Sequence, residues 1–354
     1  MARISAALAE AGHAPDAFRT AVLGRLLRAD QALLAGLAAY RRHPFERQAS
    51  APEILWFEQD SRILDYGGTG PAVLFVPSLI NRAYVMDLLP EVSMMRWFAA
   101  QGFRTFLLDW GAPGEAERHF TLTDYVAGRL ERAIQALPAP VVLAGYCMGG
   151  LLSLAAALRQ SARVRALAML AMPWDFHAGA GAEHRGRAVA AALPGLEAAM
   201  EPSGALPVDM LQTLFAGLDP FGIARKFRNF ARLDPNSAEA RRFVALEDWL
   251  NDGVPLPAPV TRQCIGGWYG HNEPARLAWR IAGEVVDPAH WEGPSFAAIP
   301  HRDRIVPPEA ALAATARLRK IKLHMAPAGH VGMVAGMNAE KALWQPLCDW
   351  LRSL

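Results

Sequence analysis

Short apolar runs alternate with amphipathic segments in two parts of the chain. Between about residues 71 and 173, runs rich in Val, Leu, Ile, Phe and Ala are followed by segments whose apolar residues recur at helical spacing. The alternation resumes near residue 294 and continues to the C-terminus. Apolar runs without polar alternation are typical of parallel strands covered on both faces. Strands are predicted at 71–77, 103–110, 140–146, 164–173, 294–301 and 320–327, and helices at 86–100, at 122–137, from 148 onward and at 339–352.

The rest of the chain has a different pattern. Residues 14–41 are predicted to form one or two helices rich in Ala, Leu and Arg, and residues 52–66 a hairpin. From Trp174 to Glu292 no strand pattern is evident, and the segment is helical, broken by Pro and Gly. The sequence therefore predicts an α/β fold with a mostly parallel central sheet and a helical cap. The expected divisions are an N-terminal helical segment at 1–50, a core at 51–174 and 293–354, and a cap insertion at 175–292.

The composition narrows the class of protein. With 52% hydrophobic and 20% charged residues, the chain is too apolar to be disordered. The 36 basic and 34 acidic residues give a formal net charge of +2, which offers no reason to expect nucleic-acid binding. Three cysteines, with no metal-ligand spacing, favour a reducing compartment without metal or disulfide framework. We therefore expect a cytoplasmic protein.

The longest uncharged stretch, Ala133 to Leu158, is long enough to cross a bilayer. It contains Pro138, Pro140 and Gly145, however, and its apolar period changes midway. A buried strand followed by a buried helix fits this pattern better than a membrane span. We expect no transmembrane segment.

The strongest chemical signal is the run Gly145-Tyr146-Cys147-Met148-Gly149, which lies where a predicted strand ends and a helix begins. This is the nucleophile-elbow pattern of the α/β-hydrolase fold, with cysteine in the usual serine position. The start of the following helix favours a thiolate. The alternative is a small buried cysteine in a tightly packed strand–helix unit.

A nucleophile at this elbow needs a base and an acid that orients the base. Asp303 follows the predicted strand 294–301, and His330 follows the next strand, in the order nucleophile, acid, histidine that this fold uses. Both are expected at the carboxyl edge of the sheet beside Cys147. We therefore predict a triad of Cys147, Asp303 and His330.

Two converging peptide N–H groups are needed to hold the oxyanion that forms during acyl transfer. Met148, directly after the nucleophile, is one candidate. The loop after the first core strand supplies the second, for which Ile80 is preferred over Leu79. By contrast, Asp109 is expected to stabilise the turn before Trp110 rather than to take part in chemistry.

Four segments together resemble the polyhydroxyalkanoate synthases: residues 79–88 (LINRAYVMDL), residues 108–111 (LDWG), residues 145–150 (GYCMGG), and the loops that carry Asp303 and His330. The resemblance extends from about residue 50 to the end of the chain. It implies an acyltransferase that polymerises (R)-3-hydroxyacyl-CoA into polyester and releases coenzyme A. Cys147 would carry the acyl chain as a thioester, His330 would act as the base, and Asp303 as its acidic partner.

The resemblance also implies partners. These are the acyl-CoA substrate, the growing polyester, the surface of a polyester granule, and a second copy or a second synthase subunit. No cofactor is implied beyond the coenzyme A thioester, which is a substrate.

Two other classes stay open from the residues alone. The same triad would serve a hydrolase, whether a thioesterase, an esterase, a dienelactone-hydrolase-like enzyme or a polyester depolymerase. A non-catalytic subunit that keeps the fold is the third reading. An apolar cap that excludes water favours an alcohol acceptor over hydrolysis, and Phe176, Trp268 and Tyr269 are among the cap aromatics that could line it.

Overall fold

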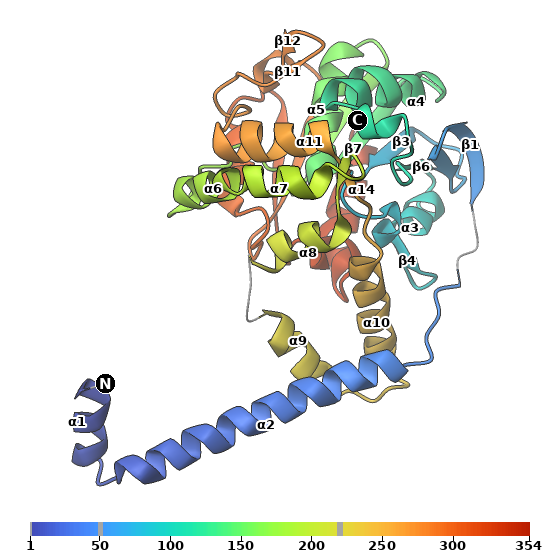
Figure 1. Cartoon of the computed structure of the whole chain (residues 1–354). Coiled ribbons are helices and arrows are strands. Elements are labelled where there is room, and N and C mark those ends of the chain that lie inside the picture. The colour runs from blue at the N-terminus through green and yellow to red at the C-terminus, as the bar shows by residue number, and fades with distance from the viewer. Residues whose placement is uncertain (1, 49–51, 218–221) are drawn as a thin grey trace. The chain divides into compact units, whose positions relative to one another are not determined.

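The computed structural model describes residues 2–48, 52–217 and 222–354 and contains an eight-stranded central sheet (Figure 1). The strand order is β1-β2-β6-β3-β7-β8-β13-β14. The strands β1 and β2 pair antiparallel with each other, β2 is antiparallel to β6, and all later pairs are parallel. The predicted α/β fold is confirmed. The strands are β1 (Glu53–Glu58), β2 (Ser61–Asp65), β3 (Ala72–Val76), β6 (Arg104–Asp109), β7 (Val141–Tyr146), β8 (Val164–Leu170), β13 (Ser295–Pro300) and β14 (Ile321–Ala326).

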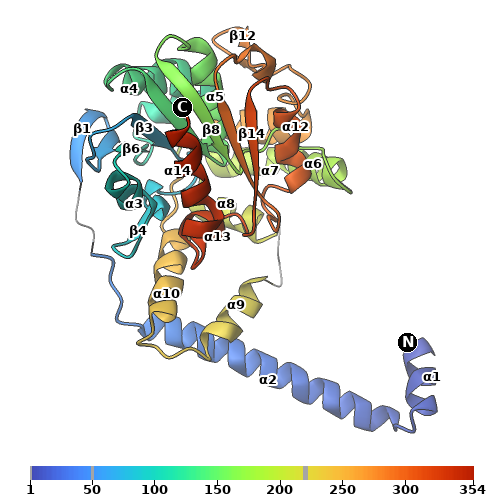
Figure 2. The same cartoon turned by 180° about the vertical axis from the view of Figure 1, so that it is seen from behind.

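Helices cover both faces of this sheet (Figures 1 and 2). On one face lie α5 (Met148–Arg159), the π-helical turn η3 (Asp124–Leu130), α4 (Glu131–Gln135) and α12 (Pro308–Thr315). On the other face lie α3 (Met94–Ala100), the short helices α13 (Gly332–Ala335) and η6 (Glu340–Trp344), and α14 (Gln345–Arg352). The rings of Phe75 and Phe98 are 5.3 Å apart, and those of Phe296 and Trp350 are 5.4 Å apart, which ties α3 and α14 to that second face.

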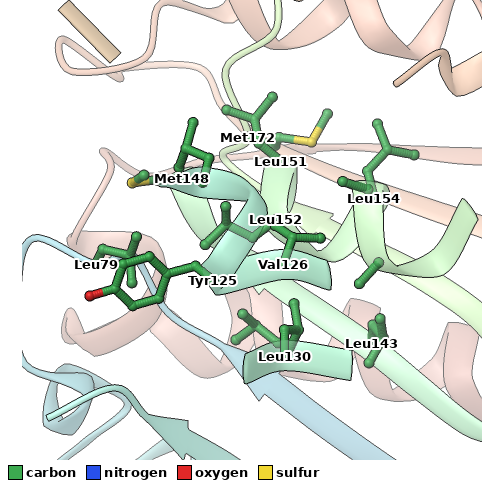
Figure 3. Close-up of a cluster of buried hydrophobic side chains, with 14 of the residues drawn as sticks. Leu79, Tyr125, Val126, Leu130, Leu143, Met148, Leu151, Leu152, Leu154 and Met172 are labelled. Atoms are coloured by element: carbon green, nitrogen blue, oxygen red, sulfur yellow. The ribbon is translucent and has the colours of Figure 1, made fainter. Parts of the chain in front are cut away.

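The helix beneath the elbow is held by a large apolar cluster. Figure 3 shows Leu151 and Leu152 of α5 near Val126 and Leu130 of η3, with Leu143 of β7 nearby. All five side chains are fully buried. Burying side chains of this size contributes about 1.5–3 kcal/mol each relative to exposure. This burial stabilises the packing of α5 against η3 and β7.

The predicted helix at 86–100 is wrong in its first half. Residues Asp87–Leu89 (β4) and Val92–Ser93 (β5) form a short hairpin, and α3 begins only at Met94. Pro90 between the two strands lacks an N–H donor and disfavours a helix interior. The Ser93 hydroxyl then caps α3 by accepting a 3.0 Å hydrogen bond from the peptide N–H of Arg96.

The segment predicted as a helical cap is mainly helical. It also contains two pairs of two-residue strands that sequence periodicity is too short to reveal. Its elements are α6 (Ala182–Ala191), α7 (Leu193–Met200), β9 (Ala205–Leu206), α8 (Val208–Ala216), α9 (Gly222–Phe230), α10 (Ala238–Asn251), β10 (Leu256–Pro257), α11 (Ala258–Arg262), η4 (Gln263–Gly270), β11 (Arg280–Ile281), β12 (Glu284–Val285) and η5 (Pro288–His290).

The chain divides into two compact units, and this division differs from the expected boundaries. Residues 219–247, inside the predicted cap 175–292, group with residues 1–47 rather than with the cap. The second unit comprises residues 48–218 and 248–354, which join the sheet and the remainder of the cap. Residues 1–47 of the expected N-terminal segment 1–50 thus share one compact unit with residues 219–247, and the expected domain boundaries stay a prediction.

Aromatic packing explains the helical unit. It contains α1 (Ala2–Glu10) and α2 (Pro15–Arg42) together with α9. The rings of Phe230 and Phe243 stack at 4.3 Å, and Tyr40 meets Phe227 edge-on at 5.8 Å. Gly36 lies so close to α9 that a Cβ there would come within 2.0 Å of the carbonyl oxygen of Phe227. Only a glycine permits this approach.

None of the helices within the described ranges combines the length and hydrophobicity needed to cross a membrane.

Candidate active site

Cys147 lies at a sharp turn between β7 and α5. Its φ of 55° and ψ of −126° are in a region that side-chain-bearing residues rarely adopt. Two glycines make the turn possible. A Cβ on Gly145 would lie 2.3 Å from the carbonyl oxygen of Gly149, and one on Gly149 would lie 2.0 Å from that of Val76. Strand β3, β7 and α5 thus meet at backbone distance, and the turn presents the Cys147 side chain at the carboxyl edge of the sheet.

Hydrogen bonds on both sides hold the turn. The N–H of Cys147 donates to the carbonyl of Leu170 at 2.8 Å, and the N–H of Gly150 donates to the carbonyl of Cys147 at 2.9 Å. The strain of a left-handed residue costs about 1–3 kcal/mol and persists only where the surroundings fix it. Here these hydrogen bonds hold the main chain that carries the Cys147 side chain.

Asp303 and His330 come together at the same edge of the sheet. Nδ1 of His330 and Oδ2 of Asp303 are 2.6 Å apart, and both side chains are buried. The other carboxylate oxygen of Asp303 accepts the N–H groups of Ile305 and Val306 at 2.8 and 2.9 Å. The carboxylate is therefore fixed by its own loop while it orients the imidazole.

The charge of Cys147 raises the pKa of His330. Burial disfavours the imidazolium, but the Cys147 thiolate and the hydrogen bonds with Asp303 and Cys147 outweigh it, and the pKa of His330 rises from 6.5 to about 10. Cys147 is half-buried and packs against the cluster of Ile299, Val306 and Ala310 that follows β13. The structure thus brings together the three residues that the sequence pattern singled out.

The two oxyanion candidates lie on either side of this turn. Met148 is the first residue of α5, and Ile80 lies in the loop after β3. The carbonyl of Ile80 accepts the N–H of Val254 at 3.3 Å, which ties this loop to the cap. In the part of the chain that the structure describes, no hydrogen bond uses the N–H of Met148 or of Ile80. Met148 and Ile80 stay the predicted oxyanion donors, with Leu79 as the alternative to Ile80.

Several aromatic side chains of the cap pack against one another. The ring of Phe176 is 5.7 Å from that of Trp268 and 4.9 Å from that of Tyr269. Burial, and then the charge of Cys147, raise the pKa of Tyr269 above its usual range. Trp268, which is buried, also meets Trp279 edge-on at 5.3 Å, so these rings form one apolar wall.

Residues set aside in the sequence have structural contacts. One carboxylate oxygen of Asp109 accepts the N–H of Gly111, and the other accepts the guanidinium of Arg62. Cys264 and Cys348 are both buried, and burial raises the pKa of each thiol. These two cysteines are chemically inert compared with an exposed thiolate.

Tyr146, which immediately precedes the nucleophile, had no predicted role. Its hydroxyl donates a 3.3 Å hydrogen bond to the main-chain carbonyl of His330, and the two rings are 5.1 Å apart. A strand residue whose partner lies 184 positions away leaves no periodic signal, so only the fold reveals this contact.

No group of three or more His, Cys, Asp and Glu side chains in the described ranges is arranged to hold a metal ion.

Comparison with known proteins agrees with the fold. A family model described as the alpha/beta hydrolase fold matches residues 71–336. Among solved structures, the thioesterase domain from the curacin biosynthetic pathway superposes with a TM-score of 0.53 at 16% identity, covering 87% of this chain and 100% of that chain. A likeness at this identity concerns the fold alone.

Curated relatives confirm the expected kinship. The poly(3-hydroxyalkanoate) polymerase subunit PhaC of Haloferax mediterranei is 27% identical over 312 residues, covering 84% of this chain and 63% of that protein. The protein of the same name from Allochromatium vinosum is 27% identical over 290 residues, covering 79% of this chain and 80% of that protein. The chain spans about three fifths of the length of the two archaeal relatives, from Haloferax mediterranei and Haloarcula marismortui.

Proposed function

The chain belongs to the alpha/beta hydrolase fold family and is related to the poly(3-hydroxyalkanoate) polymerases, and from that premise we propose that it polymerises (R)-3-hydroxyacyl-CoA into polyester and releases coenzyme A. The observation that carries the proposal is the pairing of His330 with Asp303 at 2.6 Å beside a cysteine at the elbow. A thiol, rather than a hydroxyl, is the suited nucleophile when the acyl donor is itself a thioester.

In the first step the Cys147 thiolate attacks the thioester carbonyl of the acyl-CoA. The N–H groups of Met148 and Ile80 hold the oxyanion, the carbon–sulfur bond to coenzyme A breaks, and His330 gives its proton to the departing thiolate. One thioester replaces another, so this step is close to isoenergetic. Asp303 keeps the imidazole in the tautomer and orientation that the transfer requires.

In the second step a hydroxyl group accepts the acyl chain. His330 takes the proton of a 3-hydroxyacyl hydroxyl, whose oxygen attacks the Cys147 thioester. The carbon–sulfur bond breaks, an ester forms, and the thiolate returns beside a protonated His330. The raised pKa of His330 supports this resting pair, because the imidazolium keeps its proton at neutral pH.

Exclusion of water decides between polymer and free acid. Asp303 and His330 are buried, and the rings of Phe176, Trp268 and Tyr269 form an apolar wall in the cap, which we propose faces the nucleophile. A dry site favours a bound alcohol over water as acceptor. Because Asp303 and His330 are buried and Cys147 is half-buried, we include in the proposal that the cap opens to admit the substrate.

The proposal also includes the setting in which the enzyme works. We place it in the cytoplasm at the surface of polyester granules, as a homodimer or with a second synthase subunit, and with coenzyme A thioester as substrate rather than cofactor. Sedimentation of the purified protein with and without polyester granules tests the surface association, and its molar mass in solution tests the assembly.

The competing function is hydrolysis by the same residues, as a thioesterase, an esterase or a depolymerase. The two are separated by the fate of the acyl group from (R)-3-hydroxybutyryl-CoA. Insoluble polyester formed together with free coenzyme A is the expected outcome. Free 3-hydroxybutyrate in equal amount to coenzyme A would assign the hydrolase.

A further inference from the structure

We propose that Tyr146 is a positioning residue that fixes the base His330 relative to the nucleophile Cys147. The dipeptide Tyr146-Cys147 would then determine the positions of both the base and the nucleophile. This rests on the proposed function, since it concerns the same site. It adds a residue that touches neither the acyl group nor the reacting atoms.

The contact joins two distant parts of the sheet. Tyr146 is the last residue of β7, whereas His330 lies in the loop after β14. Strands β8 and β13 separate β7 from β14, so no strand pairing couples them directly. The Tyr146 hydroxyl bridges this gap by donating to the carbonyl of His330 at 3.3 Å, and its ring lies 5.1 Å from the imidazole at an angle of 35°.

The main chain on either side of His330 has its own hydrogen bonds, and before it the N–H of Arg302 donates to the carbonyl of Ala328 at 3.2 Å. The following turn closes on itself, through the N–H of Met333 to Gly329 and the N–H groups of Val334 and Ala335 to Val331. Across the described residues, the Tyr146 hydroxyl is the one donor found on the His330 carbonyl. Asp303 thus fixes the ring through its side chain, and Tyr146 fixes the main chain that carries the ring.

The electrostatic surroundings keep Tyr146 a donor. Burial, and then the charges of Cys147 and Asp303, hold its pKa well above the usual value. The phenol therefore stays protonated at every pH at which the enzyme would work. An ionised phenol would be unable to donate and would repel the thiolate.

Tyr146→Phe keeps the ring and removes only the hydroxyl. The test is the rate of Cys147 alkylation by iodoacetamide between pH 5 and 10, because it reports the thiolate beside His330 without requiring polymer formation. The matched control is Tyr66→Phe, since Tyr66, directly after β2, also donates a hydrogen bond through its hydroxyl, to Asp87 at 3.0 Å. Cys147→Ala identifies the signal from this cysteine.

We expect Tyr146→Phe to slow alkylation at pH 7 by about 10-fold, in line with the sensitivity of such sites to small displacements. The pH of half-maximal alkylation should rise by about one unit, and kcat for coenzyme A release should fall with little change in KM. Tyr66→Phe should leave all three unchanged. A merely structural role of Tyr146 would lower the melting temperature without moving the pH midpoint.

The alkylation experiment distinguishes failure of the proposed function from failure of the positioning role. If the wild-type protein shows no fast alkylation that Cys147→Ala removes, the proposed function fails. If it does, and Tyr146→Phe has the wild-type pH midpoint and kcat, the positioning role fails while the function stands. Tyr146→Met, which fills the space without a hydroxyl, answers the same question if Tyr146→Phe does not fold.

Discussion

The carboxylate of Asp303 binds Nδ1 of His330 through one oxygen at 2.6 Å and the N–H groups of its own loop through the other. Because the two carboxylate oxygens have different partners, the effect of Asp303→Asn can be predicted. The amide oxygen should stay on the two loop N–H groups, which leaves the amide nitrogen facing His330. The imidazole would then have to accept at Nδ1, which is the wrong tautomer for a base.

We expect Asp303→Asn to lower kcat for coenzyme A release by about 10²–10⁴-fold while leaving measurable turnover. The matched control is Asp109→Asn, at the end of β6, because the Asp109 carboxylate accepts hydrogen bonds from Arg62 and Gly111. That variant should keep wild-type kcat. Unchanged turnover in Asp303→Asn would assign the acid to another residue.

The raised pKa of His330 predicts how stability depends on pH. Burial lowers this pKa, but the Cys147 thiolate and Asp303 raise it more, to about 10 against 6.5 in the unfolded chain. The folded protein therefore holds a proton that the unfolded chain releases between pH 6.5 and 10. Its contribution is complete below pH 6.5 and is lost as the pH rises toward 10.

Urea unfolding at pH 6, 8 and 10 tests this pH dependence. The free energy of unfolding of wild type should exceed that of His330→Gln, and the difference should decrease as the pH rises. Cys147→Ala removes one of the charges that raise the pKa of His330, so in that background the decrease should begin at a lower pH. An excess that grows with pH would contradict the raised pKa.

Close backbone contact at the elbow predicts unequal effects of two glycine substitutions. Gly149→Ala would place a methyl group 2.0 Å from the carbonyl oxygen of Val76 and should cost about 3 kcal/mol or more. Gly332→Ala, at the start of α13, meets no heavy atom within 4 Å and should change stability by less than about 1 kcal/mol. Thermal unfolding of both variants measures the difference. Equal melting temperatures would mean that β3 and α5 are not packed as described.

In the helical unit, two glycine substitutions in α2 are also expected to have unequal effects on stability. Gly36→Ala would bring a methyl group within 2.0 Å of the Phe227 carbonyl and should loosen α2 from α9, whereas Gly24→Ala meets only the flexible end of Arg28 at 3.4 Å. Limited proteolysis should cut Gly36→Ala faster than wild type between residues 15 and 42. Equal protection of both variants would count against the α2–α9 packing.

Much of the fold was predictable because its strands are short, apolar and bounded by turns. The six predicted core strands coincide with β3, β6, β7, β8, β13 and β14 to within three residues at each end. The order nucleophile, acid, histidine at successive strand ends was enough to select Cys147, Asp303 and His330.

The parts that sequence reasoning missed depend on contacts between distant residues. Residues 219–247 join the N-terminal helices because Phe227, Phe230 and Phe243 pack with one another and with Tyr40. Helical periodicity shows that α9 has an apolar face but not which helix covers it. The contact of Tyr146 with His330 was hidden for the same reason, since its ends are 184 residues apart.

The most direct test of the account is a single assay of the purified protein with (R)-3-hydroxybutyryl-CoA that measures coenzyme A release and the acyl product together. Cys147→Ala and His330→Ala serve as controls, confirmed as folded by circular dichroism. The account predicts coenzyme A release with insoluble polyester from wild type and neither from the two variants. Turnover by folded Cys147→Ala near the wild-type rate would contradict it.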